Sequence, residues 1–331
     1  MLCTSRPLHC LYTTSETGDH SHPPWVRATE ETLLALYRLS LPLLQKYKAM
    51  SHANKELWSP LRTGMAFLMI VLISTTIFTG IGILITGTDA LNGTNADQLR
   101  LLQFFNSIGL FLFPPIILAF WVSTKPWCFL GLKAPAHNSR ILLIGLLFVA
   151  IGSFFAIDLL SRLNSILLPD APWVHALEAQ EAKVEFTLQR LLANMTITTL
   201  LLNGIVMVAA PAFGEEFFFR GVLQRLFTEI GSHHGAILLT ALCFGLVHMQ
   251  PLSLLPILFM GLIFGYIKHW TGTLWAPIAL HFVNNGFALG SAYLNDGRLL
   301  TESTLNGTLW SLLGAFALTA GLWILSRLKS A

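Results

Sequence analysis

This sequence has few charged residues. Only 11% of its 331 residues are Asp, Glu, Lys or Arg, whereas 54% are hydrophobic. Soluble domains carry roughly a quarter charged residues, so the composition excludes an ordinary soluble domain. The formal net charge of +3 is too small to indicate a nucleic-acid partner, and we expect none. Cysteine is also scarce, and no pair among the four has the spacing of a metal site or a disulfide framework.

What the chain has instead is a series of apolar runs long enough, or nearly so, to cross a membrane. Eight such runs occur, near residues 64–86, 101–123, 141–167, 195–226, 235–250, 252–269, 273–293 and 307–326. We therefore predict an all-α fold, a polytopic membrane bundle of about eight transmembrane helices around a cytoplasm-facing intramembrane cavity. The polar stretch 169–193 carries charges at near-helical spacing and is expected to form a helix on the membrane surface.

The N-terminal segment, residues 1–60, differs from the apolar remainder of the chain. It is rich in Ser, Thr, His and Pro and has no uninterrupted apolar core of the kind found in a signal peptide. Met50 heads a compact polar lead into the first apolar run. We expect Met50 to be an alternative start, with residues 1–49 as an upstream extension, and residues 61–331 to form one integral membrane domain.

Lysine and arginine gather in alternate loops between the apolar runs, which indicates orientation. If eight spans alternate, the basic residues at the span ends fall on one side: Lys46, Lys48, Lys55, Arg62, Lys125, Lys133, Arg140, Arg225, Lys268, Arg327 and Lys329. The opposite loops carry most of the acidic residues. The bias predicts that both termini are cytoplasmic and that residues 169–193 lie on the other side.

Two adjacent carboxylates and an arginine lie inside the fourth apolar run, at Glu215, Glu216 and Arg220. An ionisable group at membrane depth costs at least about 2.5 kcal/mol, so such groups face a protein interior or a wet cavity. Residues four apart share a helix face, so Glu216 can pair with Arg220, while Glu215 is turned about 100° away. We expect Arg220 to hold Glu216 and leave Glu215 free as a general base. A buried charge cluster that only locks helix packing is the structural alternative.

Two histidines lie in other apolar runs, His248 in the fifth and His281 in the seventh. On a helix, His281 and Asn285 share a face, and Asn284 is expected to point elsewhere. With a rise of about 1.5 Å per residue from the cytoplasmic span ends, Glu215 lies about 15 Å deep, His248 about 20 Å and His281 about 14 Å. Similar depth on three spans predicts one shared site.

This polar set suits peptide hydrolysis without a covalent intermediate. A carboxylate and a histidine can hold and deprotonate a water that attacks a carbonyl group. A second histidine and an asparagine amide can donate hydrogen bonds to the oxyanion that forms. A cysteine nucleophile is disfavoured, because Cys243 lies five residues before His248 and points away from it on a helix.

Three short motifs, in this order, carry a resemblance to a known family: Glu215-Glu216-x-x-x-Arg220, Phe244-x-x-x-His248 and His281-x-x-x-Asn285. Together they resemble the signature of the CPBP family of intramembrane metalloproteases or glutamic endopeptidases, also described by the Abi domain. That family includes the type II CAAX prenyl proteases (Ras-converting enzymes) and bacteriocin-processing or immunity proteins. The resemblance covers about residues 195–293.

The resemblance implies a role for each motif residue: Glu215 and His248 activate water, His281 and Asn285 form the oxyanion hole, and Glu216 with Arg220 supports them. It also implies a protease domain at 61–331, with its catalytic core at 195–293, in a bacterial inner membrane. The expected partners are the lipid bilayer and a membrane-associated protein or peptide substrate. No cofactor is expected.

Three alternatives remain open at this point. Glu215, His248 and His281 could supply three ligands to zinc, although the sequence has no His-Glu-x-x-His motif. Intramembrane Glu, His and Arg also mark ion pathways, which keeps a transporter in view. A non-catalytic membrane immunity or scaffold protein is the third alternative, and in such a protein the Glu215→Gln change would be silent.

Overall fold

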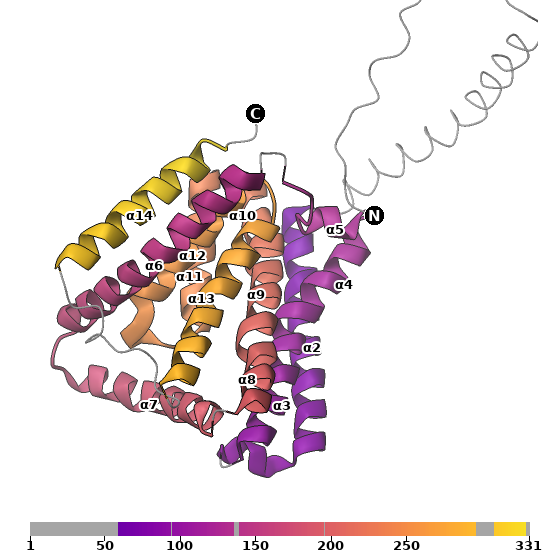
Figure 1. The fold of residues 1–331 in the computed structure, drawn as a ribbon. Coiled ribbons are helices and arrows are strands. Elements are labelled where there is room, and N and C mark those ends of the chain that lie inside the picture. The colour runs from indigo at the N-terminus through magenta and orange to yellow at the C-terminus, as the bar shows by residue number, and fades with distance from the viewer. Residues whose placement is uncertain (1–58, 94, 136–138, 195, 296–307, 329–331) are drawn as a thin grey trace, which may run out of the picture. The chain divides into compact units, whose positions relative to one another are not determined.

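The computed structural model describes residues 59–328 except 94, 136–138, 195 and 296–307 (Figure 1). The predicted N-terminal segment, including Met50, therefore lies outside the described residues apart from 59 and 60. The chain divides into two units, and nearly all described residues belong to the unit Gly64–Ala331. The unit Thr4–Thr63 contributes only residues 59–63, at the start of the first helix.

Every regular element in the described part of the chain is helical, which confirms the all-α prediction. The first half comprises α2 (Pro60–Thr86), η1 (Thr88–Asn92), α3 (Ala96–Ser107), η2 (Ile108–Leu112), α4 (Phe113–Val122), α5 (Pro126–Phe129), α6 (Ser139–Leu167) and α7 (Pro172–Leu192). The second half comprises α8 (Ile197–Asn203), η3 (Gly204–Ala209), α9 (Ala210–Glu215), η4 (Glu216–Leu223), α10 (Gln224–Ile230), α11 (His233–Val247), η5 (Pro251–Ser253), α12 (Leu254–Thr271), α13 (Trp275–Leu294) and α14 (Thr308–Ser326).

Five helical stretches are long and apolar enough to cross a membrane: Pro60–Thr86, Ala96–Val122, Ser139–Leu167, Ile197–Ile230 and Pro251–Thr271. Two shorter apolar helices, His233–Val247 and Trp310–Ser326, accompany them. The protein is thus an integral membrane protein with a polytopic helical bundle. Each of the eight predicted apolar runs coincides with a helical stretch, but the count of eight spans stays a prediction.

The predicted surface helix is α7, which runs across one end of the bundle (Figure 1). It is amphipathic, since Val174 and Leu192 are buried whereas Trp173 is exposed. Its last turn is tied to the bundle because Leu191 O accepts hydrogen bonds from Nη2 of Arg100 (2.8 Å) and Nδ2 of Asn203 (2.7 Å). Carbonyl groups in a final helical turn lack partners within the helix, so these contacts fix α7 to α3 and α8.

Helices α6 and α14 lie side by side and pack closely through small residues (Figure 1). A Cβ atom added to Gly152 would stand 2.4 Å from the backbone nitrogen of Leu318, and one added to Gly314 would stand 2.4 Å from the Phe155 ring. The close approach therefore requires glycine, as is typical of helix contacts within membranes.

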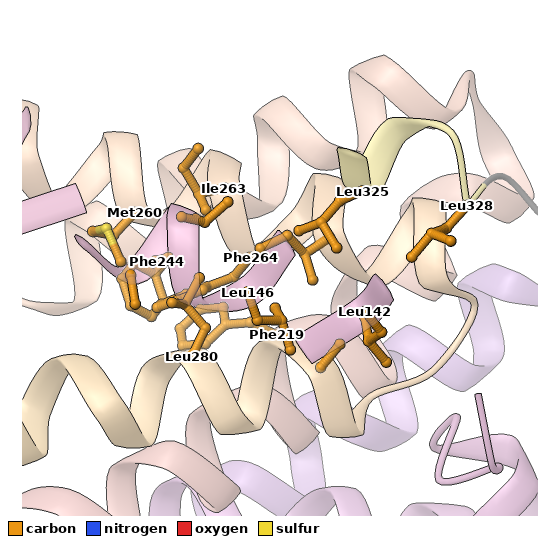
Figure 2. Close-up of a cluster of buried hydrophobic side chains, with 14 residues drawn as sticks. Leu142, Leu146, Phe219, Phe244, Met260, Ile263, Phe264, Leu280, Leu325 and Leu328 are labelled. Atoms are coloured by element: carbon orange, nitrogen blue, oxygen red, sulfur yellow. The ribbon is translucent and has the colours of Figure 1, made fainter. Parts of the chain in front are cut away.

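The main apolar core begins beside this helix pair and extends between α11, α12 and α13. Figure 2 shows it as a row of side chains from Met260 at one end to Leu328 at the other. Phe219, Phe244 and Phe264 lie within this core. The core thus reaches the segment that carries the two glutamates.

Candidate active site

The fourth span is one continuous helical stretch, Ile197–Ile230, whose winding changes along its length. It contains two π-helical segments, η3 and η4, and the two glutamates stand where α9 meets η4. π-Helical turns are rare in proteins as a whole, and those that do occur are often found at functional sites. The sequence prediction assumed a regular α-helix here, and the structure differs because the turn widens at Glu216.

Glu216 and Arg220 form a fully buried ion pair, with both side chains 0% exposed. Arg220 donates from Nη1 to Glu216 Oε1 at 2.8 Å and from Nη2 to the carbonyl oxygen of Gly261 at 2.9 Å. The second contact binds the fourth span to α12. A buried pair of charges needs such additional hydrogen bonds to offset the loss of hydration.

Three aromatic rings surround the guanidinium group of Arg220. Its central carbon lies 4.6 Å from the ring centre of Phe244, 5.0 Å from that of Phe264 and 5.9 Å from that of Phe219. Arginine is attracted to aromatic faces within about 6 Å. The rings therefore connect the ion pair to the apolar core and hold Arg220 in place.

His281, on α13, is held by contacts on two sides. Its ring stacks on Phe264, with 4.9 Å between ring centres and 17° between planes. Its Nδ1 lies 3.0 Å from Glu216 Oε1, and because a carboxylate paired with arginine only accepts, Nδ1 carries the hydrogen. Glu216 therefore orients His281 as well as Arg220, and Nε2 of His281 faces Glu215 at 3.9 Å.

His248 follows directly after α11, and its orientation is fixed by the chain itself. Its Nδ1 lies 2.7 Å from the carbonyl oxygen of Phe244, four residues earlier. A carbonyl oxygen only accepts, so Nδ1 donates, and Nε2 of the neutral ring is left with its lone pair. That nitrogen lies 3.9 Å from Glu215 Oε2. The four-residue spacing between Phe244 and His248 thus allows the hydrogen bond that orients the histidine ring.

Glu215 stands between the two histidines. Its Oε2 lies 3.9 Å from Nε2 of His248 and 3.9 Å from Nε2 of His281. This oxygen is buried and has no hydrogen-bond partner among the described residues. The structure thus places Glu215, His248 and His281 together, on three helical stretches that are distant in sequence.

Asn285 contacts the fourth span through its side-chain amide. Its Nδ2 donates to the carbonyl oxygen of Met207, in the π-helical segment η3, at 3.2 Å. The amide keeps a second hydrogen free of this contact.

These groups line a cavity of about 370 Å³. Its lining residues come from α6, α9, α11, the following turn, α12 and α13: Ile157, Ser161, Pro211, Glu215, Phe244, His248, Ser253, Pro256, Ile257, Met260, Phe264, His281, Asn284 and Asn285. The four residues predicted to do chemistry, Glu215, His248, His281 and Asn285, are all among them. Glu216 and Arg220 lie behind this lining and do not contribute to it.

The segment that carries these groups matches a known family. The model of the family described as type II CAAX prenyl endopeptidase, Rce1-like, matches residues 197–287. Residues 197–287, referred to below as the Rce1-like segment, are thus similar to this family. No curated protein and no solved structure matches the chain.

The Rce1-like segment, residues 197–287, contains every residue of the three motifs. It begins at α8 and ends within α13. The family match therefore agrees with the resemblance drawn from the motifs. Because the family is one of endopeptidases, it associates this part of the chain with peptide-bond hydrolysis in a membrane.

One residue of the Rce1-like segment was placed wrongly from its sequence. Asn284 was expected to point away from the site, but it lines the cavity and its Nδ2 lies 3.5 Å from Asn285 Oδ1. The helical turn between neighbouring residues is about 100°, and the cavity is wide enough to include both positions. Ser161 and Ser253 were also missed, because isolated serines in or beside apolar runs carry no signal of their own.

The cavity extends toward the end of the bundle at which α7 lies. Ser161 is in the second half of α6, which leads to α7, and Ser253 is in η5, which contacts α7. The Lys/Arg bias predicts that α7 is on the non-cytoplasmic side. The cavity lining thus reaches the end of the bundle that the Lys/Arg bias places on the non-cytoplasmic side, whereas the sequence predicts a cavity that faces the cytoplasm.

The zinc alternative requires a closer arrangement than the one observed. Among the residues described by the structure, no group of three His, Cys, Asp or Glu side chains is placed to hold a metal ion. Tetrahedral zinc with nitrogen and oxygen ligands near 2.1 Å brings its ligand atoms to about 3.4 Å from one another. The 3.9 Å between Glu215 Oε2 and each histidine exceeds this spacing, so zinc would fit only after side-chain movement.

Proposed function

We propose that this protein is an intramembrane endopeptidase that cleaves a membrane-associated protein or peptide with a water molecule activated by Glu215 and His248. One observation carries the proposal. The buried Oε2 of Glu215 has no partner among the described residues and faces Nε2 of two histidines at 3.9 Å, inside a cavity. The Rce1-like match to this segment supports the same reaction class.

The first step is the activation of water. Two acceptor atoms 3.9 Å apart, Glu215 Oε2 and His248 Nε2, can both be reached by one water at about 2.8 Å from each. The Glu215 carboxylate takes one proton as the oxygen attacks the carbonyl carbon of the scissile bond. His248 accepts the second hydrogen of the water and thereby directs its lone pair toward the substrate.

The second step is the stabilisation of the oxyanion. Nε2 of His281 and the remaining amide hydrogen of Asn285 are the proposed donors. His281 already donates through Nδ1 to Glu216, so it can donate through Nε2 only as the imidazolium ion. In that form its positive charge and that of Arg220 balance the negative charges of Glu216 and of the oxyanion, because Glu215 then holds the proton that it took from the water.

The last step is the departure of the amine. The proton held by Glu215 passes to the nitrogen of the scissile bond, the C–N bond breaks, and the carboxyl product retains the oxygen of the water. Glu215 returns to its carboxylate form without a covalent intermediate. Fixed hydrogen bonds act more strongly in a partly buried site of this kind than in bulk water.

Comparison of membrane proteomes tests this proposal in cells. Cells that contain the wild-type protein are expected to show new peptide termini in at least one membrane-associated protein, and cells with the Glu215→Gln variant at equal abundance are expected to lack them. Identical termini in both cell lines would contradict the proposal and favour the non-catalytic alternative.

Metal analysis separates the glutamate mechanism from its zinc-dependent form. Purified protein is expected to cleave its substrate at the same rate before and after treatment with a chelator. Stoichiometric zinc that is lost together with activity would assign Glu215, His248 and His281 to the metal instead.

A further inference from the structure

The turn between α11 and α12 connects two residues of the cavity lining, His248 and Ser253. Met249, the next residue, has φ of 53°, a left-handed conformation that is uncommon for a residue other than glycine. The short helix η5 then leads into α12, whose N-cap residue, Ser253, makes no capping hydrogen bond of its own. The first N–H groups of a helix need partners from elsewhere, so this turn depends on neighbouring elements.

Two side chains from other helices supply those partners. Glu181 of α7 accepts from the backbone N–H of Leu252 at 3.0 Å and from the Ser253 hydroxyl at 2.9 Å. Asn164 of α6 accepts from the N–H of Leu255 at 3.1 Å and donates to the carbonyl oxygen of Leu252. A carboxylate beside a helix N-terminus also interacts favourably with the helix dipole.

Glu181 differs from the other acidic residues of α7 because its side chain bonds to another element. Glu178 pairs with His175 on the same helix at 3.0 Å, and Glu185 accepts from Gln189 at 3.1 Å. Both are exposed, whereas Glu181 is half-buried. Glu181 is thus the one acidic side chain of α7 whose hydrogen bonds, among those described, reach another element.

We propose that Glu181 is a positioning residue of the active site, and that through the 249–255 turn it sets the place of His248 and of the cavity-lining Ser253. The inference rests on the proposed peptidase function. His248 stands four residues before Leu252, and its ring nitrogen must keep its place relative to Glu215 for both to hold one water. A shift of about 1 Å in such a geometry lowers a rate by about a hundredfold.

The proposal is tested by three variants of the full-length protein in vesicles. Glu181→Ala removes both acceptors and is expected to lower kcat about tenfold or more, with KM within about twofold, because His248 and Ser253 shift while the lining residues on α6, α9, α12 and α13 stay in place. Glu181→Gln can accept from Leu252 with its oxygen and donate to Ser253 with its nitrogen, so it is expected to restore most of kcat. Glu185→Ala, on the same helix, is the matched control and is expected to match the wild type.

Hydrogen exchange of residues 249–255 supplies a readout that does not depend on activity. Exchange is expected to be faster in Glu181→Ala than in Glu181→Gln or Glu185→Ala, with unchanged exchange in α13. A wild-type kcat in Glu181→Ala, equal loss in the Ala and Gln variants, or unchanged exchange in the turn would overturn the proposal while leaving the peptidase function intact. Absence of cleavage by the wild-type protein would instead overturn the function and this proposal together.

Discussion

Arg220 shows how much of this site depends on single side chains. It is fully buried and gives its hydrogens to Glu216 and to the Gly261 carbonyl. Replacement of Arg220 by Met would leave the buried Glu216 carboxylate without its arginine partner and with the hydrogen bond from His281. We expect the free energy of unfolding to fall by about 3–5 kcal/mol. Chemical unfolding in detergent measures this change.

The control for this prediction is Arg225→Met in the same span. Arg225 pairs with Glu229, donates to the Phe129 carbonyl oxygen at 3.0 Å and lies over the Phe129 ring, but its side chain is 41% exposed. Its loss is therefore expected to lower the unfolding free energy by only about 1–2 kcal/mol. Equal destabilisation by the two variants would show that burial does not increase the contribution of the Glu216–Arg220 pair to stability.

His248 provides the second prediction at the residue scale. His248→Ala is expected to lower the rate of substrate cleavage at least about a hundredfold, because the water loses one of the two groups that hold it. His234→Ala, at an exposed position, is the control and is expected to cleave normally. Unfolding curves of both variants should overlay that of the wild type. Retained cleavage by folded His248→Ala would remove this residue from the mechanism.

Residue positions were predictable from the sequence to the extent that helix geometry determines them. Counting depth along three spans was enough to place Glu215, His248 and His281 at one level. The place of Asn284 in the lining was not predictable. Whether one or two neighbouring positions of α13 line the cavity depends on the width of the cavity, which the packing of several helices determines. The hydrogen bond from His281 to Glu216 could not be predicted either, because it joins two spans whose relative rotation is determined by helix packing.

At the scale of elements, the contact between α6 and α14 depends on glycine. A methyl group at Gly152 would stand 2.4 Å from the backbone of α14, so Gly152→Ala must push the helices apart. Overpacking of this kind destabilises proteins by about 1–3 kcal/mol, and thermal unfolding in detergent should reveal it.

Gly80→Ala in α2 is the matched control for this prediction. No atom would lie within 4 Å of its new methyl group, and alanine is favoured over glycine within a helix by about 0.5–1 kcal/mol. We therefore expect an unchanged or slightly raised unfolding temperature. A loss of stability in Gly80→Ala as large as that in Gly152→Ala would contradict the packing account.

The helical runs were predictable as elements, but their internal winding was not. Apolar residues mark where a helix crosses the membrane regardless of whether its turns are α or π. The π-helical segments of the fourth span therefore left no pattern in hydropathy, and Pro211 was the one local sign of irregular hydrogen bonding. The charges at 169–193 predicted α7 correctly, but the contact of Glu181 with another element depends on the folded arrangement.

At the scale of the whole molecule, the side of the membrane that α7 occupies tests the predicted orientation. The Lys/Arg bias predicts that α7 is non-cytoplasmic. In a background without other cysteines, Ala182→Cys on the exposed face of α7 is expected to react with an impermeant maleimide added outside intact cells. Lys125→Cys, at the start of α5, is expected to react only after the membrane is opened.

The opposite labelling pattern would have a definite meaning. If Ala182→Cys reacts only in opened cells, α7 faces the cytoplasm, and the predicted cytoplasmic location of both termini is wrong. The sequence alone could not resolve this point. Charge bias indicates which loops share a side, but the end of the bundle at which a cavity opens depends on how the helices pack.

The central claim is that Glu215 activates the water that cleaves a peptide bond. The most direct test is the rate at which purified protein in vesicles cleaves one membrane substrate, measured for the wild type and for Glu215→Gln. We predict that Glu215→Gln lowers this rate at least about a hundredfold, the smallest contribution usual for a general base, and leaves the unfolding curve unchanged. A folded Glu215→Gln variant that cleaves at the wild-type rate would contradict the account.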